Sequence, residues 1–183
     1  MAVFTNQATL TYNGNVINSN ITTGEILEVL SATKTAVIAT YSQNSEITYV
    51  IQIVNAGTIA FTGLVITDDL GAYAFGTATL VPLDYIDGSV RYYSNGVLQP
   101  APAVTVGDNL VISGITVPAG GVVTIIYVTD ANQFAPLGLE DSITNTATKH
   151  SIGITYATIS LHLRKKIPHC FLFLFSHTFL HAA

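Results

Sequence analysis

Cysteine, tryptophan and charged residues are scarce in this sequence of 183 residues, which has one Cys, no Trp and 9% charged residues. The single cysteine is Cys170, so residues 1–148 can use neither disulfides nor thiol chemistry. Residues 1–148 also lack histidine, which excludes a Ser-His-Asp triad within them. No glycine-rich segment fits a phosphate-binding loop. These absences argue against an enzyme.

The few charges are unevenly distributed. Residues 1–148 hold all eleven acidic residues and two of the six basic ones, whereas residues 149–183 hold the other four and all five histidines. An acidic body argues against nucleic acid as a partner, because phosphate binding needs clustered Lys and Arg. The abrupt break predicts that residues 149–183 form a separate basic and aromatic tail. We favour a non-native or out-of-frame ending over an anchor for membranes or wall polymers, and expect that deleting the tail leaves the melting temperature nearly unchanged.

Export and membrane signals are not visible in the sequence. The start, Met1–Gln7, has neither a basic region nor the apolar core of a secretory signal peptide. No apolar run reaches the roughly 18 residues that a membrane-spanning helix needs. We therefore expect no transmembrane segment.

Alternation of apolar and polar residues with period two recurs along the chain, as in Ile47, Tyr49, Ile51 and Ile53. Dipeptides such as Asn95-Gly96 are typical of two-residue type I′ hairpin turns. No stretch has the pattern of an amphipathic helix. We therefore predict an all-β fold, an Ig-like antiparallel β-sandwich over residues 30–148, preceded by an extended N-terminal strand and linker segment at 1–29.

Alternate residues of the N-terminal segment form a mostly apolar stripe, like the core-facing side of a strand, but the sequence shows no obvious strand for it to pack against. The stripe consists of Phe4, Asn6, Ala8, Leu10 and Tyr12. Thr5–Thr9 also matches Thr144–Thr148 in four of five positions. A lone strand cannot bury such a stripe, so it either pairs with a neighbouring copy or folds back on its own sheet. In the first case residues 13–29 would be the connecting arm, and repetition of the contact would give filaments.

Three polar residues have the same parity as apolar neighbours, which means that they are an even number of positions away along the strand. Their side chains are therefore predicted to point to the same face as these neighbours, towards the core. They are Lys34, Asp68 and Asn145. Desolvation favours the neutral forms of a buried lysine and a buried carboxyl, and a neutral amine is a nucleophile. Attack of Lys34 on the Asn145 side-chain carbonyl, with Asp68 as the assisting acid, would release ammonia and leave an isopeptide bond.

Simpler interpretations of the same residues exist. Lys34 can extend its amine to solvent, Asp68 can cap the turn that follows it, and Asn145 can be an ordinary strand residue. Glu46 is a weaker candidate for the acid because its parity is opposite to that of Ile47 and Tyr49.

Several blocks, in one order along Leu30–Thr148, resemble a known family. They are Lys34-Thr-Ala, Ile47–Gly57, Val65–Leu70, Pro118–Tyr127 and Asn145–Thr148. Together they look like the conserved-repeat domain of bacterial surface proteins, known as domain of unknown function 11. The resemblance implies an Ig-like fold on a bacterial or archaeal envelope. It places the family's Lys, Asp and Asn positions on Lys34, Asp68 and Asn145, a trio that related surface domains use for an isopeptide bond.

Other candidate sites give weaker signals. Tyr85, Tyr92 and Tyr93 could form a sugar-binding platform, but tyrosine is a common strand residue. Asp84, Asp87 and Gly88 lack the density of oxygen ligands that a calcium loop needs. The remaining candidates, without a standard zinc spacing, are His162, His169, Cys170 and His177. We therefore expect neither a metal nor a cofactor.

The sequence thus predicts a structural or assembly module of a bacterial cell-surface or spore-surface protein, with the N-terminal strand as the candidate for self-association. The alternative is an adhesin-type module that recognises a glycan or a matrix protein through loops 69–88 and 95–108.

Overall fold

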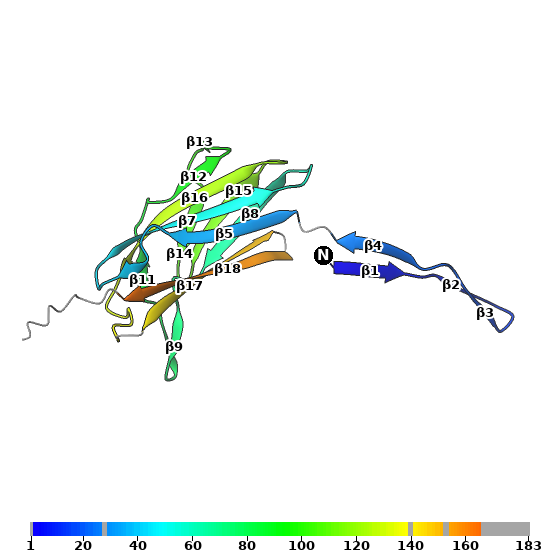
Figure 1. Cartoon of the computed structure of the whole chain (residues 1–183), viewed down its shortest axis with the longest axis horizontal. Coiled ribbons are helices and arrows are strands. Elements are labelled where there is room, and N and C mark those ends of the chain that lie inside the picture. The colour runs from blue at the N-terminus through cyan, green and yellow to red at the C-terminus, as the bar shows by residue number, and fades with distance from the viewer. Residues whose placement is uncertain (1, 27–28, 139–140, 152–153, 166–183) are drawn as a thin grey trace, which may run out of the picture.

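The computed structural model describes residues 2–26, 29–138, 141–151 and 154–165. All regular elements in these ranges are β-strands. No helix within them is long and apolar enough to span a membrane. Two six-stranded sheets pack face to face in a sandwich (Figure 1). The all-β prediction is confirmed.

The first sheet runs in the order β13-β12-β16-β7-β5, and β11 pairs with β16 as well. Its central strands are β7 (Glu46–Asn55) and β16 (Val122–Ala131), which pair antiparallel over nearly their whole length. The shorter strands are β5 (Leu30–Ala36), β11 (Leu83–Tyr85), β12 (Arg91–Ser94) and β13 (Val97–Leu98). Alternate residues of β7 and β16 are fully buried, because successive side chains of a strand point to opposite faces.

The second sheet runs in the order β14-β15-β8-β17-β18-β6. Its strands are β6 (Thr40–Tyr41), β8 (Phe61–Asp68), β14 (Ala103–Val106), β15 (Leu110–Val117), β17 (Ser142–Ser151) and β18 (Ile154–Lys165). The pairing of β18 with β6 is parallel, and the other described pairings are antiparallel. Isoleucine, leucine, valine and tyrosine side chains from both sheets fill the space between them.

Two Asn-Gly turns have the backbone that the sequence predicts. The φ angles are 47° and 78° at Asn13 and Gly14, and 48° and 80° at Asn95 and Gly96. Positive φ at both central residues is the mark of a type I′ turn, whose twist matches that of the strands it joins. The second turn connects β12 to β13.

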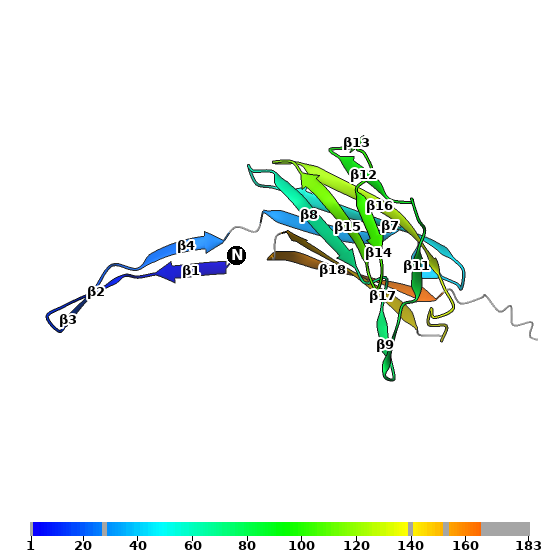
Figure 2. The same cartoon turned by 180° about the vertical axis from the view of Figure 1, so that it is seen from behind.

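The N-terminal segment forms a hairpin arm, defined here as residues 2–26. Strand β1 (Ala2–Asn6) pairs with β4 (Thr22–Ile26), and β2 (Thr9–Tyr12) pairs with β3 (Asn15–Asn18). The arm extends away from the sandwich beyond the start of β5 (Figures 1 and 2). Within the single chain, most of residues 13–29 returns along the first two strands. Among the described strands, β1 and β2 do not pair with either sheet of the sandwich, and pairing with a neighbouring copy stays a prediction.

The sandwich does not end at Thr148. Strand β17 continues to Ser151, and β18 pairs with it from Ser142–Arg164 to Ser151–Ile154. The Leu163 side chain is 1% exposed and belongs to the core. The composition break at residue 149 therefore does not coincide with a structural boundary. Residues 166–183, which complete the predicted tail, lie outside the described residues.

A small hairpin projects from the sandwich within residues 69–88, one of the two segments that the sequence analysis treats as loops. It consists of β9 (Tyr73–Phe75) and β10 (Ala78–Leu80) (Figure 1). The Phe75 side chain at its tip is 68% exposed.

Candidate functional site

The three polar residues that the sequence places on the core face are all buried. Lys34 lies on β5 of the first sheet, whereas Asp68 on β8 and Asn145 on β17 belong to the second. Their exposed fractions are 6%, 0% and 0%. Asp68 lies opposite Ala147 in the β8–β17 register, so Asn145 is two residues farther along the same face. The predicted orientation of the three side chains is confirmed.

Lys34 and Asp68 form an ion pair across the sandwich. The Lys34 Nζ atom lies 2.6 Å from Asp68 Oδ2, and both side chains are fully buried. The other carboxylate oxygen, Oδ1, accepts a hydrogen bond of 3.0 Å from the Leu70 amide. This turn-capping contact and the ion pair are therefore present together. A buried pair of this kind is weak evidence for stability, because desolvation of both charges offsets much of their attraction.

Burial lowers the pKa of the Lys34 amine, although the negative charges of Asp68 and Asp69 act in the opposite direction. The amine also lies over the Tyr49 ring, with Nζ 4.9 Å from the ring centroid. Proton transfer from Lys34 to Asp68 along their short hydrogen bond would turn the ion pair into a neutral amine and a carboxylic acid. The site can thus supply both a nucleophile and an acid.

Two tyrosines that the sequence analysis did not single out complete the site. Tyr49 and Tyr127 face each other in the β7–β16 register, and their rings stack with centroids 5.3 Å apart. The Tyr127 hydroxyl donates a 2.5 Å hydrogen bond to Asp68 Oδ2, the oxygen that also holds Lys34. Burial raises the pKa of both phenols, so both remain protonated at neutral pH. Their shared parity with Ile51 and Ile125 could have placed both on the core face.

The side-chain amide of Asn145 is buried without a hydrogen bond. Neither Nδ2 nor Oδ1 has a hydrogen-bond partner among the described residues, and the same holds for the Tyr49 hydroxyl. The amide is close enough to both phenols to act against the larger effect of burial on their pKa values, but it makes no contact of hydrogen-bonding geometry. An unbonded buried polar group costs about 1–3 kcal/mol, so it calls for an explanation.

A second buried lysine lies on β17, where the sequence analysis places the first residue of the tail. The Lys149 side chain is 3% exposed, and its Nζ donates a 3.0 Å hydrogen bond to the Leu30 carbonyl oxygen on β5. Lys149 shares the inward face with Asn145 and Ala147. It therefore joins the two sheets through a neutral acceptor, while Lys34 joins them through a carboxylate.

The other candidates from the sequence lie apart from this cluster. Glu46 is exposed, and it pairs with Asp130 in the strand register. Tyr92 donates its hydroxyl hydrogen to the Thr116 carbonyl, while Tyr85 and Tyr93 are half-buried. Asp84 accepts a hydrogen bond from Asn132.

For the metal candidates, the described part of the chain contains no group of three or more His, Cys, Asp or Glu side chains placed to hold a metal ion. His162 is exposed, and the other three tail candidates lie outside the described residues: His169, Cys170 and His177.

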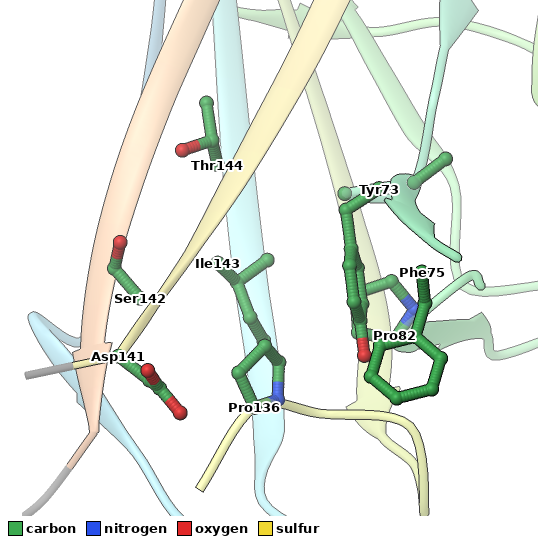
Figure 3. A pocket seen from close by; sticks show the side chains of 10 residues that line it. Tyr73, Phe75, Pro82, Pro136, Asp141, Ser142, Ile143 and Thr144 are labelled. Carbon is green, nitrogen blue, oxygen red and sulfur yellow. The ribbon is translucent and has the colours of Figure 1, made fainter. Parts of the chain in front are cut away.

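A pocket of about 590 Å³ opens beside the projecting hairpin (Figure 3). Its lining combines aromatic and proline side chains with the polar side chains at the start of β17. The labelled lining residues are Tyr73, Phe75, Pro82, Pro136, Asp141, Ser142, Ile143 and Thr144. Tyr73 is held in place by a hydrogen bond from its hydroxyl to the Phe134 carbonyl. Loop 69–88, which the alternative function would use for a ligand, thus contributes to this pocket.

Comparison with protein-family models and with curated proteins gives no match for this chain. Solved structures do match. The N-terminal domain of the Streptococcus gordonii adhesin Sgo0707 has a TM-score of 0.54 at 14% identity, covering 74% of this chain and 32% of that one. The pilus backbone RrgB from Streptococcus pneumoniae has a TM-score of 0.51 at 13% identity, and the match covers 66% of this chain and 31% of that one. The fold is an Ig-like β-sandwich.

A third match is the C-terminal domain of the Streptococcus pyogenes antigen I/II-family protein AspA. It has a TM-score of 0.53 at 12% identity and covers 90% of this chain and 55% of that one. The chain thus spans between about a third and about half of the structures it resembles. At these identities the likeness concerns the fold, and the resemblance to the conserved-repeat family stays a prediction.

Proposed function

We propose that this chain is a structural module of a bacterial cell-surface or spore-surface protein, and that a covalent bond between Lys34 and Asn145 fastens its two sheets together. The fold supports the first part, since adhesins and a pilus backbone contain domains of the same kind. The buried cluster of Lys34, Asp68 and Asn145 supports the second.

The proposed reaction needs no cofactor. The neutral amine of Lys34 attacks Cγ of Asn145, the bond from Cγ to Nδ2 breaks, and ammonia leaves. Asp68 takes a proton from Lys34 at the start and supplies an acidic proton to the amide during the attack. The product is a secondary amide between the two side chains. Because each molecule reacts once with itself, the chain is not an enzyme.

The observation that carries the proposal is the unbonded Asn145 amide beside a buried ion pair. A buried amide in a settled core is expected to find partners for its donor and acceptor atoms. Here the amide has none among the described residues, while an amine and a carboxyl that can react with it face the same core. Formation of the bond would remove the Asn145 NH2 group and the Lys34 charge together.

The intact mass of the folded protein tests the proposal. We expect the measured mass to be lower than the sequence mass by one ammonia. Asp68→Ala should restore the full mass because the amine then has no acid partner. Lys149→Ala is the matched control, since it removes the other buried lysine and should leave the ammonia loss unchanged. A full sequence mass for the folded wild-type protein would contradict the proposal.

We also propose that the hairpin arm, residues 2–26, mediates self-association. Five large apolar side chains on it are 60–69% exposed: Leu10, Tyr12, Val16, Ile17 and Ile21. Each two-stranded part of the arm also has outer strand edges, which pair readily with another chain. Of the stripe residues named above, Asn6, Ala8 and Leu10 are exposed in the monomer.

Deletion of residues 1–26 should abolish multimers while the melting temperature of the sandwich changes little. The reason is that, among the described residues, the hydrogen bonds of the arm join arm residues to one another. Light scattering over a range of protein concentrations and a thermal melt provide the two readouts. A full-length chain that stays monomeric at high concentration would contradict the self-association, and a large drop in melting temperature would show that the arm supports the sandwich.

A further inference from the structure

The Tyr127 hydroxyl occupies a special position in the buried cluster. It donates a 2.5 Å hydrogen bond to Asp68 Oδ2, and Lys34 Nζ lies 2.6 Å from the same oxygen. Its ring stacks on Tyr49 with an interplanar angle of 19°, which fixes its orientation. Asp68 itself makes no hydrogen bond to Asn145, whose amide atoms have no partner among the described residues. A proton on Asp68 therefore has no direct hydrogen bond to the amide that it must activate. The Tyr127 hydroxyl is bonded to Asp68 and near enough to the Asn145 amide to be affected by it, but it must turn from Asp68 towards Oδ1 to reach that amide.

We propose that Tyr127 relays a proton from Asp68 to Asn145 during formation of the Lys34–Asn145 bond, an inference that rests on the function proposed above. The phenol accepts the proton of Asp68 Oδ2 on its oxygen and gives its own hydrogen to Asn145 Oδ1. The tyrosine stays neutral before and after the step, as a hydroxyl relay does.

The relay fits a balanced sequence of steps. First, one proton moves from Lys34 Nζ to Asp68 Oδ2, which leaves a neutral amine and a carboxylic acid. The Nζ lone pair then forms a bond to Asn145 Cγ, while the carbonyl electrons move to Oδ1. Oδ1 takes the Tyr127 hydrogen, and Tyr127 takes the Asp68 proton.

Collapse of the adduct completes the reaction. The hydroxyl proton of the adduct passes to Nδ2, the Cγ–Nδ2 bond breaks, and ammonia leaves. One of the two remaining Nζ protons returns to Asp68. The new amide keeps the other, so all protons and electrons are accounted for.

Two further facts favour Tyr127 over its neighbour. Tyr49 lies against the same amide, but its hydroxyl has no hydrogen bond among the described residues and so no bonded path from Asp68. Burial keeps the pKa of Tyr127 well above its ordinary value, so the phenol does not lose its proton to bulk water. A group that must pass on a proton without ionising benefits from this shift.

The test compares the rate of ammonia loss in Tyr127→Phe and Tyr92→Phe, followed by intact mass from the time of synthesis in a cell-free system. Tyr92 is the control, because its replacement also removes hydrogen bonds of a core phenol: the hydroxyl donates to the Thr116 carbonyl and accepts from the Thr116 amide. Removal of an acid–base group typically slows a reaction by about 100-fold or more. We therefore expect Tyr127→Phe to react at least about 100-fold more slowly than wild type, and Tyr92→Phe to react at the wild-type rate.

A background of Asn145→Ala separates chemistry from folding, because no bond can form there. In that background Tyr127→Phe and Tyr92→Phe should lower the melting temperature by similar amounts. Equal rates of ammonia loss in the two single variants would overturn the relay while leaving the bond itself intact. A wild-type protein that never loses ammonia would overturn both the bond and the relay.

Discussion

Asn145→Ala should lower the melting temperature by roughly 10–20 °C. The proposed bond closes a loop of about 110 residues, and in the chain-entropy model such a cross-link stabilises the folded state by on the order of 4–5 kcal/mol. For a domain of this size each kcal/mol shifts the midpoint by about 2–4 °C. Thermal unfolding followed by circular dichroism measures the shift, and it should be the same with and without a reductant.

This variant is informative because the opposite result follows if no bond forms. Removal of an unbonded buried amide would then relieve its desolvation cost and leave the stability unchanged or slightly higher. Thr129→Val is the matched control, since its fully buried hydroxyl likewise has no hydrogen-bond partner among the described residues. A small change in melting temperature in both Asn145→Ala and Thr129→Val would contradict the bond. Asp68→Ala should be less stable still, because it also leaves the Lys34 charge without its partner, at a cost of about 3–5 kcal/mol.

Ending the chain at Ser151 should abolish cooperative unfolding. This truncation removes β18, which pairs with β17 along most of the latter strand and contributes Leu163 to the core. Loss of one buried leucine side chain typically costs about 2–5 kcal/mol, and here the strand ladder is lost as well. A thermal melt with near-ultraviolet circular dichroism, which reports on tyrosine packing, provides the measurement.

A chain that ends after Lys165 is the control for the truncation. It keeps every described strand and should melt at the temperature of the full-length protein. The melting temperature of Leu163→Ala should be lower than that of the chain that ends after Lys165, but this variant should still unfold cooperatively. If the chain that ends at Ser151 melts cooperatively at the full-length temperature, the tail predicted from composition is dispensable and β18 contributes nothing to the sandwich.

Periodicity in the sequence was sufficient to predict the sandwich, because the sheets bury one face of each long strand. Ile47, Tyr49, Ile51 and Ile53 all lie in the core as their alternation indicates. Composition was a poor guide to the boundary, since it records the kind of residue and not its pairing. The same limit applies to the arm: the Asn13-Gly14 turn is visible in the sequence, but which strand returns along β1 depends on register.

Parity placed Lys34, Asp68 and Asn145 on the core face, but it could not show how they are arranged. The contact between Lys34 and Asp68 joins two sheets, and its geometry depends on how those sheets pack. Tyr49 and Tyr127 were overlooked because inward tyrosines are ordinary in strands. Their hydroxyls become informative only when the structure places one on Asp68 and leaves the other unbonded.

Peptide mapping by tandem mass spectrometry can locate the proposed bond between Lys34 and Asn145. The full-length protein is purified, digested and searched for one branched species that joins the segment around Lys34 to the segment around Asn145. We expect this species, with a mass lower than the sum of its two peptides by one ammonia. We expect it to be absent from Asp68→Ala. Recovery of the two peptides from the folded wild-type protein as separate linear species, each with its full mass, would show that the bond does not form.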